Sequence, residues 1–299
     1  MLAIFLDSLL PPLLIVGAGF ALERTLGVDA RSLSRVALYV FMPALIFVTL
    51  LQSQVGGAEF AQIGLFVVAA TAAMWGFGLG ISRLLGLDGT QTHAFLLAIL
   101  FGNCGNYGLA VVLSAFGQAG LERGLVYFVV SSLLTQTFGA YLASRGRYSV
   151  RQSVRNVLRL PLIYAMVAAF AVRASGLRMP NPLLSALSLP RAGAIPLMQV
   201  LLGVQLARVS QRLDLRFVGT ATLVKLAGAA ALSFALAALL GLRGLARSVS
   251  ILETSMPTAV TTLVLSTEFG TRAEEVGGVV LLSTLLSPLT LTAVLALLQ

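Results

Sequence analysis

Ten apolar stretches, most of them about 20 residues long, fill almost the whole chain and are separated by short polar segments. Stretches of this length are typical of helices that cross the hydrocarbon core of a bilayer. Only 10% of the 299 residues are charged, against about 25% in ordinary soluble domains. We therefore expect an all-α integral membrane protein with ten transmembrane helices, the sixth of which is short, with an earlier start near Val154 left open. The expected spans are residues 2–22, 33–51, 60–84, 93–116, 124–143, 160–172, 183–206, 217–240, 249–269 and 276–298.

The fourth span contains a stretch that a simple membrane-crossing helix has no reason to carry, Phe101-Gly-Asn-Cys-Gly-Asn-Tyr-Gly-Leu-Ala110. Glycine costs roughly 1 kcal/mol against alanine inside a helix, and each buried asparagine amide needs hydrogen-bond partners. Non-helical backbone at membrane depth is tolerated only inside the protein or beside a water-filled cavity. The stretch therefore predicts a broken helix that presents Asn103, Asn106 and freed backbone groups to a polar site.

The two halves of the chain repeat at an offset of 152 or 153 residues. At an offset of 153, Phe116-Gly117 aligns with Phe269-Gly270, and at an offset of 152 residues 102–106 fall on Thr254-Ser-Met-Pro-Thr258, the other place where a span is interrupted. Five such matches occur within this narrow range of offsets. Each half has five spans, an odd number, so the halves are expected to be inverted relative to each other. Inverted repeats with helix breakers at corresponding positions are typical of secondary transporters whose site lies between the two breaks.

The arginine content of the loops predicts the orientation of the chain. Lysine and arginine are retained on the cytoplasmic side of a membrane, and the odd-numbered loops hold thirteen arginines against five in the even-numbered loops. We therefore expect a protein of the cytoplasmic (inner) membrane with both termini outside. The densest run, from Arg145 to Arg159, favours an amphipathic surface helix that anchors the topology, with a regulatory partner site left open. The odd loops hold Arg24, Arg31, Arg35, Arg83, Arg145, Arg147, Arg151, Arg155, Arg159, Arg208, Arg212, Arg216 and Arg272, and the even loops hold Arg123, Arg173, Arg178, Arg243 and Arg247.

At these motifs the sequence resembles the auxin efflux carrier family, in particular its bacterial members, over essentially its full length. The resemblance is carried by Asn103-Cys-Gly-Asn-Tyr-Gly108 and Glu253-Thr-Ser-Met-Pro-Thr-Ala259, with support from Phe41-Met-Pro-Ala44 and Ile195-Pro-Leu197. It implies a fold similar to bile-acid symporters and sodium/proton antiporters, in which the fourth and ninth helices unwind and cross. Where family members often carry proline this chain has Ala110, so the first break is expected to be less sharp than the break at Pro257.

The resemblance also implies a division of labour between two helix groups. Spans 1, 2, 6 and 7 would form a scaffold, with Pro43 and Pro196 as helix breakers facing the core. Spans 3–5 and 8–10 would form a core that moves against the scaffold like an elevator. Residues 1–144 and 160–299 would be the two repeats, and residues 145–159 a basic cytoplasmic linker. A homodimer through the scaffold is left open.

A small organic acid is the substrate that the resemblance implies, and the residues offer a physical basis for binding it. Half-helix N-termini and amide groups suit an anion without an obligatory arginine, and serine and threonine hydroxyls add donors. The substrate site is therefore expected to be formed by Asn103, Gly105, Asn106, Gly108, Ser255, Met256, Pro257 and Thr258.

Two ionisable residues inside spans are candidates for coupling to a proton or to sodium. Intramembrane carboxylates are functional candidates by default, and we interpret Glu253, about five residues into the outer half of the ninth span, as a proton or cation carrier. An interface carboxylate wetted from outside is the alternative. Lys225 is either a snorkelling side chain or a site cation, and helix rise places it roughly 15 Å from Glu253 in depth. Ser131, Thr135 and Gln136 form a polar stripe in the fifth span that either lines a cavity or serves packing.

Several other classes of protein fit the sequence less well. One histidine, His93, and one cysteine, Cys104, provide neither a metal cluster nor a disulfide, and no nucleophile–base motif supports an enzyme. No cofactor is expected. The net charge of +9 reflects loop arginines, since no aromatic and basic module indicates nucleic acid. A channel and a membrane sensor built on a carrier fold remain as alternatives to active transport.

Overall fold

The computed structural model describes residues 1–145, 149–209 and 214–298, without the side chains of Val150, Ser153, Val154 and Asn156. Two of the loop arginines, Arg147 and Arg212, lie outside this part of the chain. Within the described ranges the regular secondary structure is helical, apart from one isolated backbone bridge. Seven of the described helices are long and apolar enough to cross a membrane. The prediction of an all-α membrane protein is therefore confirmed.

Helices cover each of the ten predicted stretches, and short π-helical turns, labelled η, interrupt several of them. The first half contains α1 (Leu2–Ile4), η1 (Phe5–Leu9), α2 (Leu10–Leu26), α3 (Ala30–Val36), η2 (Ala37–Phe41), α4 (Met42–Gln52), α5 (Gly57–Leu84), α6 (Gly89–Leu100), η3 (Cys104–Gly108), α7 (Leu109–Leu134), η4 (Thr135–Gly139) and α8 (Ala140–Ala143). Gly117 divides α7, because its φ of 64° and ψ of −159° are not helical.

The second half follows the linker helix α9 (Val150–Val157). It contains α10 (Pro161–Ser175), α11 (Asn181–Ala207), α12 (Leu215–Leu223), η5 (Val224–Gly228), α13 (Ala229–Leu239), α14 (Gly244–Thr254), α15 (Val260–Phe269) and α16 (Ala273–Leu298). The sixth stretch therefore begins at Pro161, and the helix around Val154 is a separate one.

Several helices begin earlier than their apolar stretches, because aspartates cap them. The Asp29 carboxylate accepts hydrogen bonds from the backbone N–H groups of Arg31 and Ser32, and Asp88 and Asp214 cap α6 and α12 in the same way. Such a cap stabilises a helix by about 1 kcal/mol. Because the first turns after these caps are polar, hydropathy alone placed the starts of these helices too late.

The helices α2, α4, α10 and α11 form one packed group, which corresponds to the predicted scaffold spans. A Cβ atom at Gly19 would collide with the Val200 carbonyl, and one at Gly203 with the Val16 carbonyl. The backbones of α2 and α11 therefore approach each other as closely as small residues permit. The prediction that Pro43 and Pro196 break helices is wrong: α11 continues through Pro196, and Pro43 lies in the first turn of α4 directly after η2. Neighbouring groups and local π turns compensate for a lost hydrogen bond in membrane helices.

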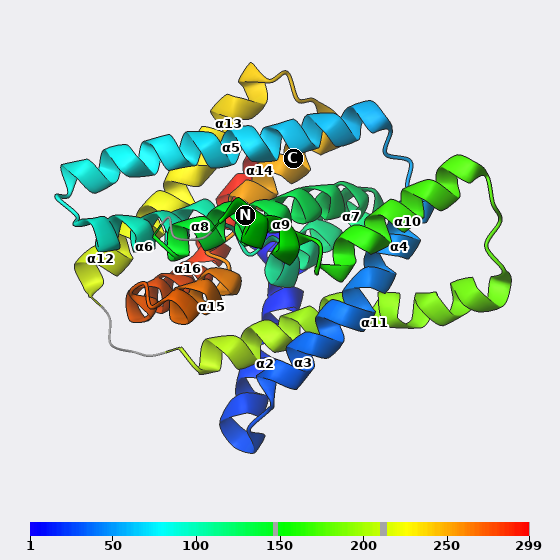
Figure 1. Cartoon of the computed structure of the whole chain (residues 1–299), viewed down its shortest axis with the longest axis horizontal. Helices are drawn as coiled ribbons and strands as arrows, with labels where there is room; N and C mark the ends of the chain where they lie inside the picture. The colour runs from blue at the N-terminus through cyan, green and yellow to red at the C-terminus, as the bar shows by residue number, and fades with distance from the viewer. Residues whose placement is uncertain (146–148, 210–213, 299) are drawn as a thin grey trace.

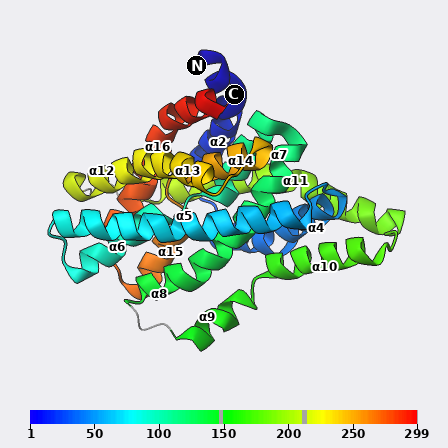
Figure 2. The same cartoon turned by 90° about the horizontal axis from the view of Figure 1, so that it is seen from above.

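The remaining long helices form a second group, with α5 running along one side as a straight rod (Figure 1). α12 packs on α16, α13 on α14, and α14 on α7. The first turns of the chain, α1 and η1, contact α16, so the two ends of the chain lie close together (Figure 2).

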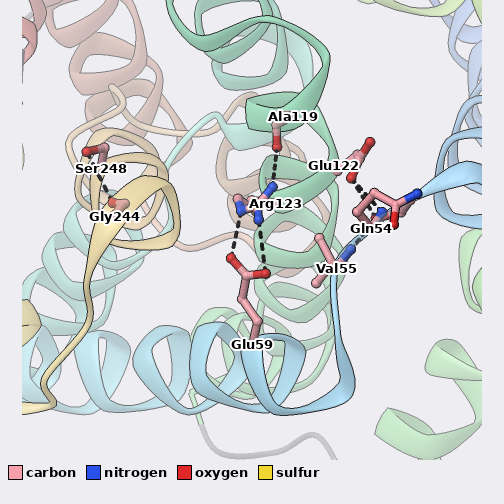
Figure 3. A network of polar contacts seen from close by, with 9 residues as sticks. Gln54, Val55, Glu59, Ala119, Glu122, Arg123, Gly244 and Ser248 are labelled. Atoms are coloured by element: carbon pink, nitrogen blue, oxygen red, sulfur yellow. Dashed lines mark hydrogen bonds and ion pairs between the residues drawn. The ribbon is translucent and has the colours of Figure 1, made fainter.

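Hydrogen bonds and ion pairs between loops hold each end of the bundle together. Two even-numbered loops, the second and the fourth, meet at one end, and two odd-numbered loops, the first and the seventh, meet at the other. At one end the Arg123 guanidinium pairs with Glu59, with 2.7 Å between Nε and Oε1 (Figure 3). At the same end the Glu122 carboxylate accepts from the Ser53 hydroxyl. At the other end Arg208 pairs with Glu23, with 2.7 Å between Nε and Oε1. The helices between these loops therefore run from one end of the bundle to the other.

Candidate functional site

The two predicted breaks are confirmed, and they lie against each other. α6 ends at Leu100, after which Phe101 is extended and η3 starts at Cys104. α14 ends at Thr254, and α15 starts at Val260. The first break covers residues 101–103 and the second covers residues 255–259.

A short antiparallel bridge joins the breaks between Gly102 and Thr258. The Asn103 N–H donates to the Pro257 carbonyl at 2.7 Å, and the Ala259 N–H donates to the Phe101 carbonyl at 2.9 Å. Glycine suits position 102, because a Cβ there would lie 3.2 Å from the Glu253 carbonyl oxygen. Each break therefore satisfies backbone groups that the other has freed, which hydrocarbon could not do.

The hydroxyl groups of the second break are used inside the protein. The Thr258 hydroxyl donates to the Ala98 carbonyl at 2.8 Å, and the Thr258 N–H donates to the Ser283 hydroxyl at 3.1 Å. The Ser255 hydroxyl donates to the Ile251 carbonyl at 2.8 Å. Ser255, Met256, Pro257 and Thr258 are all buried, so these predicted substrate-binding residues support the crossing from within.

A cavity of about 370 Å³, which we call the crossing cavity, lies between the two helix groups beside the first break. This volume is in the range of small-molecule sites. Met42, Met198 and Gln205 line it from the first helix group. The second group contributes Asn103, Gly105, Asn106, Ser131, Thr135 and Gln136, all of them predicted site or cavity residues. The second break contributes Ala259, Val260 and Thr261.

Two amides give the crossing cavity its polar character. The Asn106 side chain donates from Nδ2 to Gln205 Oε1 at 3.5 Å, a contact that joins η3 to α11. The Asn103 Nδ2 is buried and has no hydrogen-bond acceptor within the described residues. A buried donor without a partner costs about 1–3 kcal/mol. A ligand oxygen in the cavity would remove that cost.

Packing around η3 depends on two glycines with different neighbours. A Cβ on Gly105 would lie 2.5 Å from Phe128 Cε2, so the aromatic ring occupies the space beside that cavity-lining residue. A Cβ on Gly108 would collide with Glu253 Oε2. Gly108 does not line the cavity and instead makes room for the Glu253 carboxylate.

Glu253 lies deeper than the sequence indicated. The sequence placed it about five residues into the ninth span, but α14 starts at Gly244 and Glu253 is its tenth residue. The side chain is 0% exposed. Gly108 and Gly124 border its carboxylate, and no described donor hydrogen-bonds either oxygen. The carboxylate lies against Gly108 of η3, and Glu253 does not line the crossing cavity.

The Lys225 side chain is buried, and it does not snorkel. It is 1% exposed, and its Nζ donates to the Thr254 carbonyl at 3.4 Å. The predicted separation in depth of roughly 15 Å from Glu253 is therefore wrong. Lys225 is the eleventh residue from the start of α12 at Leu215, so both residues reach the middle of the bundle from opposite ends.

Gln205 is a polar residue of the crossing cavity that sequence reasoning missed, as it missed Ser34, Ser132 and Thr261. Met198, Leu201 and Gln205 follow the three-to-four-residue spacing of one helix face. A glutamine on that face, two residues after Gly203, was the available signal. Within the described residues no group of three or more metal-binding side chains occurs.

Comparison with known proteins identifies the family of this chain. A family described as "Membrane transport protein" matches residues 4–143 and 143–295. An uncharacterised transporter of Methanothermobacter thermautotrophicus is 28% identical over 295 residues, which cover 95% of each chain. An uncharacterised transporter of Methanocaldococcus jannaschii is 23% identical over 275 residues, which cover 88% of each chain. The chain therefore belongs to the membrane transport protein family of the auxin efflux carriers, and it is a transporter rather than an enzyme.

Proposed function

We propose that the protein is a secondary transporter that carries a small organic anion or weak acid by alternating access. The observation that carries this proposal is the crossing cavity between the two helix groups, with Asn106 in contact with Gln205 and the buried Asn103 amide unpaired. None of the described residues that line this cavity has a charged side chain. Amide and hydroxyl donors would therefore hold the carboxylate.

A second cavity, of about 440 Å³, supports alternating access. It lies between α2, α4, α7 and α11, and is lined by Leu45, Ala110 and Gln199. The crossing cavity is lined by Met42, Asn106 and Met198 of the same spans. Along each of these spans, the residue that lines one cavity is at most four positions from the residue that lines the other. A barrier about one helical turn thick, roughly 5 Å, therefore separates the two cavities. Sliding the core by a few such turns would move the site from one side of this barrier to the other.

The proposed topology has ten spans in two inverted halves, with both termini outside the cytoplasmic membrane. It is supported by the contacts between even-numbered loops at one end of the bundle and between odd-numbered loops at the other. The excess of arginines in the odd-numbered loops supports the orientation. A reporter that is active only in the cytoplasm, fused after residue 299, should be silent. Strong reporter activity there would overturn the orientation.

We further propose that Glu253 carries a coupling proton. A buried carboxylate without donors is strongly disfavoured in its charged form. The groups that face it are the two bordering glycines, with Cys104, Tyr127 and Lys225 on neighbouring elements. Because Gly108 belongs to η3, a charge on Glu253 would act on the segment that carries Asn106. Proton uptake would thus favour anion binding.

A thermal-shift screen of the purified protein tests the proposal. Small carboxylates are added at two pH values, with and without sodium, since a ligand that binds the folded state raises the melting temperature. We expect stabilisation by carboxylates that grows as pH falls. Transport by the same ligand in liposomes should saturate with concentration, whereas conductance without saturation would support a channel instead.

A further inference from the structure

Arg191 is a cation inside the membrane-spanning helix α11 that the loop analysis did not include. It is the eleventh residue of that helix, about 15 Å along it from Asn181. Ionisable groups inside spans are functional candidates by default. Its known contact is a hydrogen bond from Nη1 to Gln52 Oε1 at 3.3 Å. A guanidinium has five N–H donors, so this contact leaves most of them free.

No carboxylate neutralises Arg191 among the described residues. The ion pairs there are Arg123–Glu59, Arg208–Glu23 and Arg272–Glu275. Glu122, at the same end of the bundle, accepts hydrogen bonds from Ser53 and from the Gln54 backbone. Asp7, one turn before the cavity-lining Pro11, is exposed and forms none of these ion pairs.

Arg191 lines the second cavity, together with polar groups from both helix groups. Ser188 and Gln199 belong to α11, whereas Ser114 and Gln118 belong to α7. The rest of the lining is largely apolar and includes two prolines of α2 and Leu113. Among the described lining residues, Arg191 is the charged side chain of this cavity, and the crossing cavity has no charged one. The surroundings therefore combine one cation with apolar walls.

We propose that the second cavity is a separate binding site for a soluble carboxylate with an apolar body, held by Arg191. The guanidinium would bind the carboxylate in the bidentate geometry that arginine favours, and Ser114 or Gln118 would add a donor from the facing helix. The proposal rests on the proposed function only in taking organic acids as cargo. The second-cavity proposal adds to the transport proposal a binding step at the end of the bundle where α11 begins.

Benzoate and its uncharged analogue benzamide are suitable probes, with binding measured by calorimetry in phosphatidylcholine nanodiscs. Arg191→Gln should weaken benzoate binding about tenfold or more, and Arg191→Lys should weaken it less. Benzamide should bind poorly to every variant. Arg178→Gln, which removes an exposed arginine at the same end, should leave benzoate binding within twofold.

A further variant and a lipid comparison exclude the competing explanations. Gln52→Ala removes the structural partner but keeps the cation, so benzoate binding should persist; a loss equal to that of Arg191→Gln would overturn the proposal. Unchanged binding in Arg191→Gln would overturn it as well. If phosphatidylglycerol blocks benzoate in an Arg191-dependent way, the site takes a lipid headgroup and the proposal is wrong. Asn106→Ala alters the crossing cavity alone, and Arg191→Gln alters the second cavity alone. The proposed function and the second-site proposal can therefore fail independently in these binding measurements.

Discussion

The two breaks occupy corresponding positions in the two halves, yet their polar groups have different uses. In the second break the Thr258 and Ser255 hydroxyls both donate to backbone carbonyls, and Ser283 accepts from the Thr258 N–H. In the first break the Asn103 amide has no acceptor within the described protein, and the Asn106 amide reaches across to Gln205. One break is internally satisfied, and the other presents donors to a cavity.

This difference shows that a repeated motif does not imply a repeated role. Hydroxyls are short and can return a hydrogen bond to their own helix or to a neighbouring one. A carboxamide carries two donors and one acceptor group at the end of a longer side chain, so it can extend from the backbone into a cavity. The residues that stabilise the crossing of the two breaks are therefore different from the residues that present donors to the cavity.

The strongest test removes the amides of the first break. In an Arg191→Gln background, which leaves the crossing cavity as the carboxylate site, Asn103→Ala or Asn106→Ala should abolish detectable binding of a stabilising carboxylate, because each lost hydrogen bond to a charged group is worth about 1.5–3 kcal/mol. The protein should remain folded and inserted, as judged by its melting temperature and by size-exclusion chromatography. Normal carboxylate affinity in either variant would show that the amide only clamps helices together.

The converse test alters the second break. Thr258→Val should lower the free energy of unfolding by about 1–3 kcal/mol, because the Ala98 carbonyl loses its donor in a buried place. Carboxylate affinity at a temperature where the variant is folded should remain close to that of the wild type. A variant that keeps its melting temperature and loses binding would place Thr258 in the site and contradict the comparison.

The mildest test concerns Glu253, the buried polar side chain beside the second break that lacks a donor. One coupled proton changes affinity by at most about tenfold per pH unit. Binding to the wild type should weaken as pH rises, since the ionised carboxylate opposes it. Glu253→Gln mimics the protonated form and should bind well at high pH, with a flatter pH profile of transport. A wild-type profile in this variant would exclude Glu253 as the proton carrier.

Much of the fold and one side of the site could be predicted from the sequence. Hydropathy located the helices, and the glycines and asparagines of residues 102–108 located the first break. The direction of the Thr258 and Ser255 hydroxyls could not be predicted, because it depends on carbonyls from α6 and α14. The depth of Glu253 was misjudged, since the polar residues between Gly244 and Ser248 concealed the first turns of α14.

The hydrogen bonds between Asn103 and Pro257 and between Ala259 and Phe101 also affect how the protein can be made. Residues 101–103 leave the ribosome about 150 positions before their partners. Until the later segment is inserted, the freed backbone groups of the first break have no such partner in the bilayer, and each unsatisfied group costs several kcal/mol. A protein cut down to its first 144 residues would carry this defect permanently. The halves resemble each other in sequence, yet each completes the backbone of the other at the crossing.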